Sequence, residues 1–153
     1  MLGPACCFDW DARHAFAKLV HGGYVQAVLA GNALATHDLE AGYRSTALGQ
    51  DIYTQISQPG GHYNHIDTIN QVRKAGSIEK FVAEQNIQDG IMAACVQCKV
   101  PYVLTGSIRD DGPLPEVYAD VYEGQNAMRD QVKKSTTVIC LATTLHSIAT
   151  GNM

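Results

Sequence analysis

The segment VPYVLTGSIRDDGPLPEVYAD, residues 100–120, contains the repeating unit of an α/β fold. An apolar run at residues 100–104 ends in a polar turn, and the charged loop at residues 109–112 follows. Pro113 and Pro115 then introduce a helical pattern. In open α/β sheets, ligands bind where such turns leave the carboxyl ends of the strands. The segment therefore predicts a strand, a ligand-binding turn and the start of a helix.

Two other parts of the chain repeat this pattern. Residues 25–29 are apolar and run into Gly-Asn-Ala at residues 31–33, and residues 137–142 run into Thr-Thr-Leu-His at residues 143–146. The carboxyl ends of parallel strands lie along one edge of a sheet. We therefore expect the three polar turns to line one shared cleft.

Strand-like and helix-like patterns alternate along the whole sequence, which predicts a parallel sheet covered by helices. We expect strands at residues 2–8 (an edge strand), 24–30, 100–104 and 136–142. One helix is expected near residues 9–11, with either Asp9 or Asp11 as its N-cap. Further helices are expected at residues 33–40 and 62–74, from residue 78, from Asn86, and from Val117 to Val132. Residues 43–61 have no clear period and predict a loop or a short irregular helix.

Composition limits the classes of function. A chain of 153 residues with 46% hydrophobic and 17% charged residues is typical of one folded domain. The net charge of −4 argues against nucleic acid as the main partner, since a basic surface is missing. No apolar run approaches the roughly 20 residues of a membrane span, and the N-terminus does not resemble a signal peptide.

The five cysteines are an odd number, and two of them are adjacent. A disulfide framework is therefore not expected, which favours a reducing, cytoplasmic setting. The chain begins in an apolar run and stops just after a strand-to-turn unit, so we expect it to be a piece of a longer polypeptide.

Cysteine and histidine pairs each have a functional and an ordinary interpretation. Cys95 and Cys98 have redox spacing, but Cys95 falls late in a predicted helix on its apolar face, which favours ordinary buried cysteines. His62 and His65 are three residues apart at the start of a predicted helix, so both side chains could bind one metal ion or anion. No third ligand is identifiable from the sequence, so helix capping and surface hydrogen bonding are favoured, and no metal site is expected.

The acidic residues are also open to two interpretations. Asp110 and Asp111 follow a strand and could bind a pair of ribose hydroxyls or a substrate ammonium group, or could form a solvated turn. Glu116 and Asp120 lie one helical turn apart and predict an exposed acidic face. The turn at residues 143–147 could hold a diphosphate at a helix N-terminus, although the usual Gly-x-Gly-x-x-Gly sequence is absent.

Four phrases carry a family resemblance that spans nearly the whole chain. They are AGNALATHD (residues 30–38), GGHYNH (60–65), GSIRDDGPLP (106–115) and LHSIATGNM (145–153). They resemble the LOR/SDH conserved-domain family, once named after lysine-oxoglutarate reductase/saccharopine dehydrogenase. Its members include archaeal ornithine cyclodeaminases and the C-terminal region of cyanobacterial arginine dihydrolase/ornithine cyclodeaminase proteins. The resemblance implies a single Rossmann-like, NAD-binding α/β domain over residues 1–153, of the type found in deoxyhypusine synthase.

The resemblance also implies which residues contact NAD. Matched residue by residue, these are Asn32, Ala33, Asp111, Thr143, Thr144, Leu145 and His146. Family members continue beyond the sequence TGNM into another strand that ends in acidic residues, so part of the cofactor site would lie outside this chain.

The implied reaction converts L-ornithine to L-proline and ammonia, with NAD taking a hydride and returning it. Asp110 is our candidate for the general base, with His37 and Asp38 as others. Expected partners are a small amino acid substrate and further copies of the chain. A non-catalytic NAD-binding, regulatory or oligomerisation module is the alternative, and an NAD-linked enzyme acting on another amine, such as lysine, is a third possibility.

Overall fold

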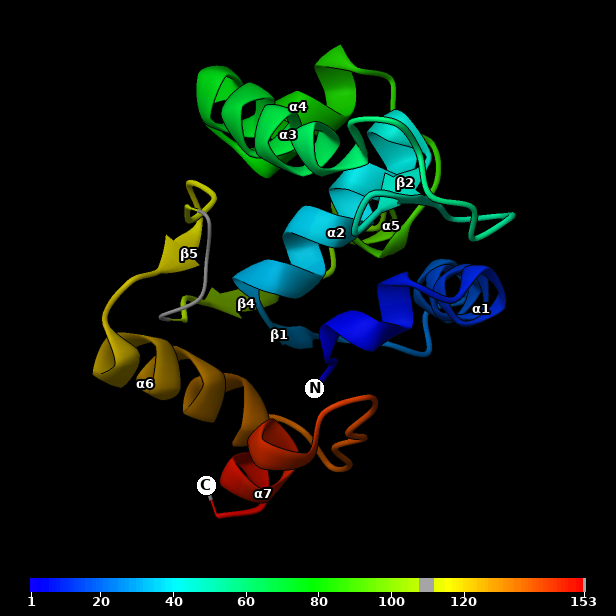
Figure 1. The fold of residues 1–153 in the computed structure, drawn as a ribbon. Coiled ribbons are helices and arrows are strands. Elements are labelled where there is room, and N and C mark those ends of the chain that lie inside the picture. The colour runs from blue at the N-terminus through cyan, green and yellow to red at the C-terminus, as the bar shows by residue number, and fades with distance from the viewer. Residues whose placement is uncertain (108–111, 153) are drawn as a thin grey trace.

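The structure is a computed structural model that describes residues 1–107 and 112–152. Its central sheet contains three parallel strands in the order β1 (Val28–Gly31), β4 (Tyr102–Thr105) and β5 (Val117–Tyr118). Gly31, the last residue of β1, lies opposite Thr105, the last residue of β4. The carboxyl ends of these two strands therefore lie side by side (Figure 1).

Two single residues extend this sheet beyond β1. Leu2 forms parallel bridges with both Ala30 and Leu141. The backbone N–H of Leu2 donates to Leu29 O at 2.8 Å, and the N–H of Gly3 donates to Leu141 O at 2.9 Å. The segment around Leu141 is thereby held in the same sheet as β1, although it does not pair with β1 directly.

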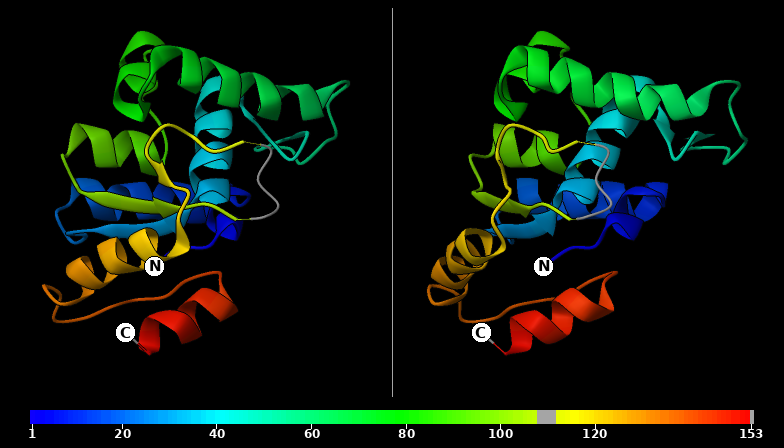
Figure 2. Two further views of the ribbon diagram at one scale, coloured as in Figure 1. Left: turned by 90° about the vertical axis from the view of Figure 1, so that its left-hand side faces the viewer. Right: turned by 60° about the vertical axis from the view of Figure 1, so that its left-hand side comes forward.

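Helices cover both faces of the sheet, which confirms the predicted Rossmann-like arrangement (Figure 2). Val28, Ala30 and Leu104 point into the larger core, whereas Leu29 and Val103 point to the opposite face and contact Met128. The alternation follows from the two-residue period of a strand. The larger core is built with α1 (Trp10–His21), α2 (Asn32–Arg44), α3 (Gly61–Ala75), α4 (Ile78–Glu84) and α5 (Ile91–Gln97), and the other face is covered by α6 (Val121–Val132).

The remaining elements are short. The 3₁₀ helix η1 (Pro4–Cys7) connects Leu2 to α1, and the strands β2 (Thr46–Ala47) and β3 (Gln50–Asp51) form a small antiparallel pair after α2. Helix α7 (Thr144–Gly151) is the last element. No helix in the described part of the chain is long and apolar enough to cross a membrane.

Several predicted elements differ from the observed ones. The predicted strand at residues 2–8 is only the bridge at Leu2, because Pro4 has no backbone N–H and begins η1. The predicted strand at residues 136–142 is likewise reduced to Leu141. The predicted loop at residues 43–61 contains the β2–β3 pair.

The start of one helix also differs from the prediction, because a carboxylate caps the helix at a later residue. The sequence predicts a helix from Val117, but Val117 lies in β5. Helix α6 begins after Asp120, which caps it by accepting from the N–H groups of Tyr122 and Glu123. Asp120 is therefore a cap and not half of a free acidic face. Glu116 also has a structural role, because its Oε1 accepts from Ile78 N at 2.6 Å.

A buried ion pair joins α1, α2 and α5. Arg13 Nε donates to Asp38 Oδ1 at 2.7 Å, and both side chains are almost completely buried. Asp38 also accepts from the backbone N–H groups of Ile91 (3.0 Å) and Met92 (2.7 Å), which makes it the cap of α5. This explains why the helix expected from Asn86 starts only at Ile91.

The ion pair leaves no room for a side chain beside it. A Cβ on Gly90 would lie 2.2 Å from Arg13 Nη2, and Gly90 has a φ of +121°, which L-residues rarely adopt. Asp89, next to it, forms a second ion pair with Arg13. The Asp89-Gly90 turn is therefore shaped by the buried guanidinium group.

We expect Asp38→Asn to lower the free energy of unfolding by about 3–5 kcal/mol, because it leaves the buried Arg13 charge without its main partner. Urea unfolding followed by circular dichroism measures the change. Asp67→Asn is the control, since the Arg44–Asp67 pair has side chains 41% and 34% exposed and should contribute about 0–1 kcal/mol. Equal losses in the two variants would contradict the assignment.

Candidate functional site

The three predicted strand ends lie along one edge of the sheet, as the sequence suggested. Gly31 and Thr105 are paired, and Leu2 connects Ala30 to Leu141. The sequence did not indicate that Leu2 and Gly3 would stand between two of these ends. A Cβ on Gly3 would lie 2.0 Å from Ala142 O, so only glycine allows this close approach.

Helix α2 begins directly at this edge. Gly31 is its N-cap and has no side chain to bond the first N–H groups of the helix. Ala33 lies in the first turn and is partly exposed. Free N–H groups and the helix dipole make such a terminus suitable for an anion, as in dinucleotide-binding folds.

Asn32, a predicted NAD contact, is buried and bonded to the chain itself. Its Oδ1 accepts from Leu114 N at 2.9 Å, and its Nδ2 donates to Gly112 O at 3.2 Å. The side chain thus fixes the segment that follows the acidic loop. Asp110 and Asp111, the other residues predicted here, lie outside the described residues.

The Thr-Thr-Leu-His turn forms the start of α7. Thr143 is the N-cap residue, but its hydroxyl pairs with His146 Nδ1 at 2.7 Å and not with a backbone N–H. Thr144 opens the helix, and the side chain of Leu145 is 79% exposed. A second helix N-terminus without a side-chain cap therefore lies beside the same sheet edge.

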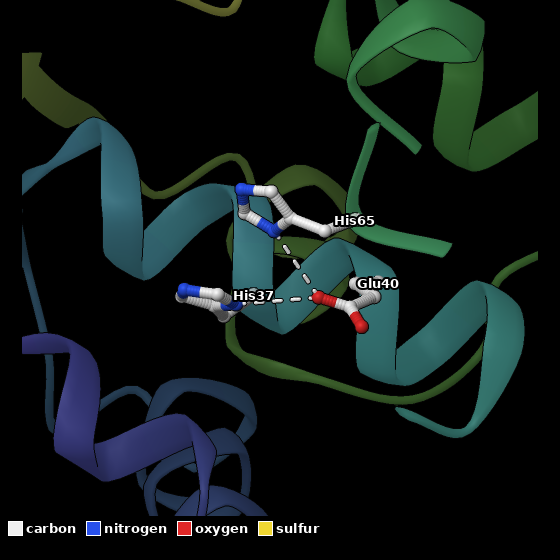
Figure 3. A group of neighbouring side chains, drawn as sticks. All are labelled: His37, Glu40 and His65. Carbon is white, nitrogen blue, oxygen red and sulfur yellow. Dashed lines mark hydrogen bonds and ion pairs between the residues drawn. The ribbon is translucent and has the colours of Figure 1, made fainter. Parts of the chain in front are cut away.

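A separate polar cluster lies between α2 and α3 (Figure 3). Nδ1 of His37 and Nδ1 of His65 are each 3.2 Å from the same oxygen, Oε2 of Glu40. The two imidazole rings are tilted by 32°, with centroids 4.6 Å apart. His65 is the second histidine of the predicted pair, and it contacts Glu40 of α2, whereas the first, His62, is exposed.

The other oxygen of Glu40 is also hydrogen-bonded. Thr46 Oγ1 donates to Oε1 at 2.9 Å, and Asn64 Nδ2 donates to Thr46 Oγ1 at 3.1 Å. Burial raises the pKa of Glu40, but the hydrogen bonds from His37, His65 and Thr46 outweigh it, so its pKa lies below the ordinary value. Glu40 is therefore an ionised carboxylate, completely buried, that accepts three hydrogen bonds.

A shallow hollow of about 240 Å³ adjoins this cluster. Phe8, which lines it, packs edge-on against His37 with ring centroids 5.0 Å apart. Ala47, which also lines the hollow, directly follows Thr46. His37 and Thr46 thus connect the cluster to residues that line the hollow, although none of the three cluster residues lines it.

Three donor residues this close could also hold a metal ion, since their ligand atoms all lie within 4.8 Å of one another. The hydrogen bonds already satisfy both oxygens of Glu40, and Oε2 is at hydrogen-bonding distance from both imidazoles. No polar atom of Glu40 is left without a partner. The geometry is therefore that of a hydrogen-bonded cluster.

The other candidates from the sequence have structural explanations. Asp38 is excluded as a general base, because it is committed to Arg13 and to the start of α5. Cys95 is buried, and burial raises its pKa to about 12, which does not fit a redox thiolate. Cys98 is exposed, with its sulfur 3.2 Å from His21 Nδ1.

Comparison with known proteins now identifies the family. Residues 1–153 match the family described as arginine dihydrolase ArgZ-like, C-terminal, Rossmann fold. The chain belongs to this ArgZ-like C-terminal Rossmann-fold family. It is 52% identical over 151 residues to an ornithine cyclodeaminase of Methanocaldococcus jannaschii, covering 99% of this chain and 36% of that protein. The chain thus spans about a third of the length of that relative.

Solved structures agree with this assignment. A conserved LOR/SDH protein of Methanococcus maripaludis superposes with a TM-score of 0.93 at 48% identity, over 99% of this chain and 45% of that one. The ternary complex of AgrE with ornithine and NAD⁺ superposes with a TM-score of 0.92 at 39% identity, over 99% of this chain and 22% of that one. The family resemblance and the Rossmann-like fold inferred from the sequence are both confirmed.

Asn32→Ala should release the segment that contains Gly112 and Leu114, because the buried Leu114 N–H loses its acceptor. We expect a loss of about 1–3 kcal/mol in the free energy of unfolding. Amide hydrogen exchange should show faster exchange at Leu114. Asn126→Ala on the exposed side of α6 is the control, and unchanged exchange at Leu114 in Asn32→Ala would contradict the assigned role.

Thiol labelling should separate the two cysteines of the Cys-x-x-Cys sequence. With a pKa of about 12, about one Cys95 thiol in ten thousand is ionised at pH 8, so the folded chain should label at exposed Cys98 and not at Cys95. Mass spectrometry after iodoacetamide treatment measures this, and unfolding in urea should expose Cys95. Labelling of Cys95 at the rate of Cys98 in the folded chain would refute its burial.

Proposed function

We propose that this chain is the NAD-binding part of an ornithine cyclodeaminase, which converts L-ornithine to L-proline and ammonia. The observation that carries the proposal is the close similarity, over 99% of this chain, to AgrE in its complex with ornithine and NAD⁺. The relative from M. jannaschii with 52% identity is an ornithine cyclodeaminase. Both similarities extend across every element described above.

The sheet edge fits a dinucleotide. The start of α2, after Gly31, offers backbone N–H groups without a competing side-chain cap, and the start of α7, after Thr143, does the same. A diphosphate bound there would be stabilised by these N–H groups and by the helix dipoles. Ala33, Thr144, Leu145 and His146 stay our predicted contacts, together with Asn32, Asp111 and Thr143.

When bound, NAD would supply the hydride chemistry, accepting a hydride from an amine-bearing carbon of ornithine and returning it to the cyclic imine. The chain's own contribution is to orient the cofactor at the sheet edge and to handle protons on the substrate amines. Asp110, outside the described residues, stays one candidate for the proton acceptor.

We also propose that the chain works as part of a longer, homo-oligomeric enzyme of the cytoplasm. It covers 36% of the M. jannaschii relative and 22% of AgrE, so further substrate contacts and an acidic ribose ligand would come from outside it. The same partial coverage supports the alternative, a non-catalytic NAD-binding or oligomerisation module. Formation of proline from ornithine by the full-length protein separates the two, because a module would bind NAD without turnover.

The predicted cofactor site is tested by isothermal calorimetry of NAD with the 153-residue chain and with the full-length protein. Ala33→Asp places a carboxylate in the first turn of α2, where it would repel a diphosphate but interact favourably with the helix dipole. We expect NAD affinity to fall at least about tenfold, a change of about 1.4 kcal/mol, with no loss of thermal stability.

Ala12→Asp is the matched control, because it adds the same charge to the first turn of α1 at an exposed position away from the proposed site. NADP serves as the ligand control. Equal NAD affinity in Ala33→Asp and Ala12→Asp would place the diphosphate elsewhere. Absence of NAD binding to the folded full-length protein would overturn the proposed function.

A further inference from the structure

We propose that the His37–Glu40–His65 cluster is the site that receives the ammonium group of the substrate, with His37 accepting its proton through Nε2. This inference rests on the proposed function and assigns a proton acceptor that the sequence alone could not choose. In these roles His37 is a catalytic residue, and Glu40 is a positioning residue. His65 shares the carboxylate and forms the second wall of the site.

The carboxylate fixes which nitrogen of His37 is available. An ionised carboxylate only accepts hydrogen bonds, so the imidazole nitrogen that faces Oε2 of Glu40 must carry the proton. That nitrogen is Nδ1, at 3.2 Å. In the neutral form of this imidazole, Nε2 of His37 carries the lone pair, and it makes no hydrogen bond to any residue in the described part of the chain. A neutral imidazole held in this way presents a lone pair to an incoming N–H group.

The charge of the cluster suits a cation. With neutral imidazoles, Glu40 gives the cluster one negative charge, because its neighbours Thr46 from β2 and Asn64 from α3 are neutral. Arg44 of α2 is paired with Asp67 of α3, and Asp38 of α2 is paired with Arg13 of α1. Phe8, which follows η1, adds an apolar wall. A primary ammonium group matches this environment better than an anion does.

The cluster is also close to the proposed cofactor edge. His37 lies five residues after Asn32 on α2, which corresponds to about 8 Å along the helix axis. On α3, His65 is one turn from Ile69 and two turns from Arg73, and both of these lie against Gly112, where the β4 loop returns. His37 thus lies within two turns of the sheet edge on α2 and contacts Phe8, which lines the hollow.

The proposed step balances as a simple proton transfer. The substrate ammonium group, R–NH₃⁺, gives one proton to Nε2 of His37, which produces R–NH₂ and an imidazolium ion. The carboxylate of Glu40 stabilises the new positive charge across the Nδ1–H bond. The freed nitrogen lone pair can then form the C=N bond as hydride leaves the neighbouring carbon. The second amine loses its own proton to solvent and closes the ring, and the imidazolium then returns its proton to the first amino group, which departs as ammonia and leaves a cyclic iminium.

The test compares three variants of the full-length protein. Asn in place of His37 can keep a donor near the Nδ1 position but has no group corresponding to Nε2, so His37→Asn should lower kcat about 10²–10⁴-fold while NAD affinity stays unchanged. Glu40→Gln removes the charge that orients both imidazoles and should shift the acidic limb of the pH–rate profile. His62→Asn is the matched control, because His62 is exposed and one turn from His65 on α3.

A readout specific to proton transfer separates this role from a structural one. Activity of His37→Asn should recover as pH rises, since the free amine then forms without a base, and added imidazole should partly restore it. His62→Asn should show neither effect. A kcat and pH profile in His37→Asn that match the wild type would overturn the proposal, as would zinc retained stoichiometrically by the wild type and lost in His37→Asn.

Failure of the proposed function is distinguishable from failure of this inference. If the wild-type protein binds NAD but makes no proline, the reaction assignment fails and the amine site is tested by ¹⁵N NMR of the histidines. Ornithine should then move the Nε2 resonance of His37 and leave that of His62 in place. An unmoved His37 resonance at saturating ornithine would overturn the amine site.

Discussion

The position of α2 depends on the buried pairing of Asp38 with Arg13. Asp38 is held by the guanidinium group of α1 and by two backbone N–H groups of α5, so one side chain connects three helices in the larger core. Buried charges of this kind are costly unless every polar atom finds a partner, and removing one partner is strongly destabilising. The same constraint fixes the rotation of α2, and therefore the direction in which its other polar residues point.

Helix α2 buries several polar side chains, which have three different roles. Asn32 binds the segment at Gly112 and Leu114, Asp38 joins the helix to α1 and α5, and His37 and Glu40 contact His65 of α3. A helix whose only role was packing would bury apolar residues at these positions. The start of α2 and the two cluster residues His37 and Glu40 therefore belong to the same helix.

How much of this the sequence could predict depends on whether the signal was local. The strands β1 and β4 were predictable because they are β-branched, apolar runs bounded by turns, and the family phrases indicated the fold and the NAD-linked function. Glu40 was not predicted as a site residue because a glutamate within a helical pattern usually faces solvent. His37 and Glu40 have the three-residue spacing of one helix face, but no local sequence pattern indicated that His65 and Thr46 would contact Glu40. The bridges at Leu2 and Leu141 were likewise set by tertiary pairing, and the roles of Asp110 and Asp111 stay predictions.

The central claim, that this fold serves an ornithine cyclodeaminase that cycles a hydride through NAD, is tested most directly by stopped-flow absorbance with deuterated substrate. The full-length protein, loaded with NAD, is mixed with ornithine carrying deuterium at both amine-bearing carbons, and proline is analysed by mass spectrometry. The account predicts a transient rise in reduced-nicotinamide absorbance, slowed by deuteration, and proline that keeps its deuterium. Proline formed at an unchanged rate without any transient would contradict the account.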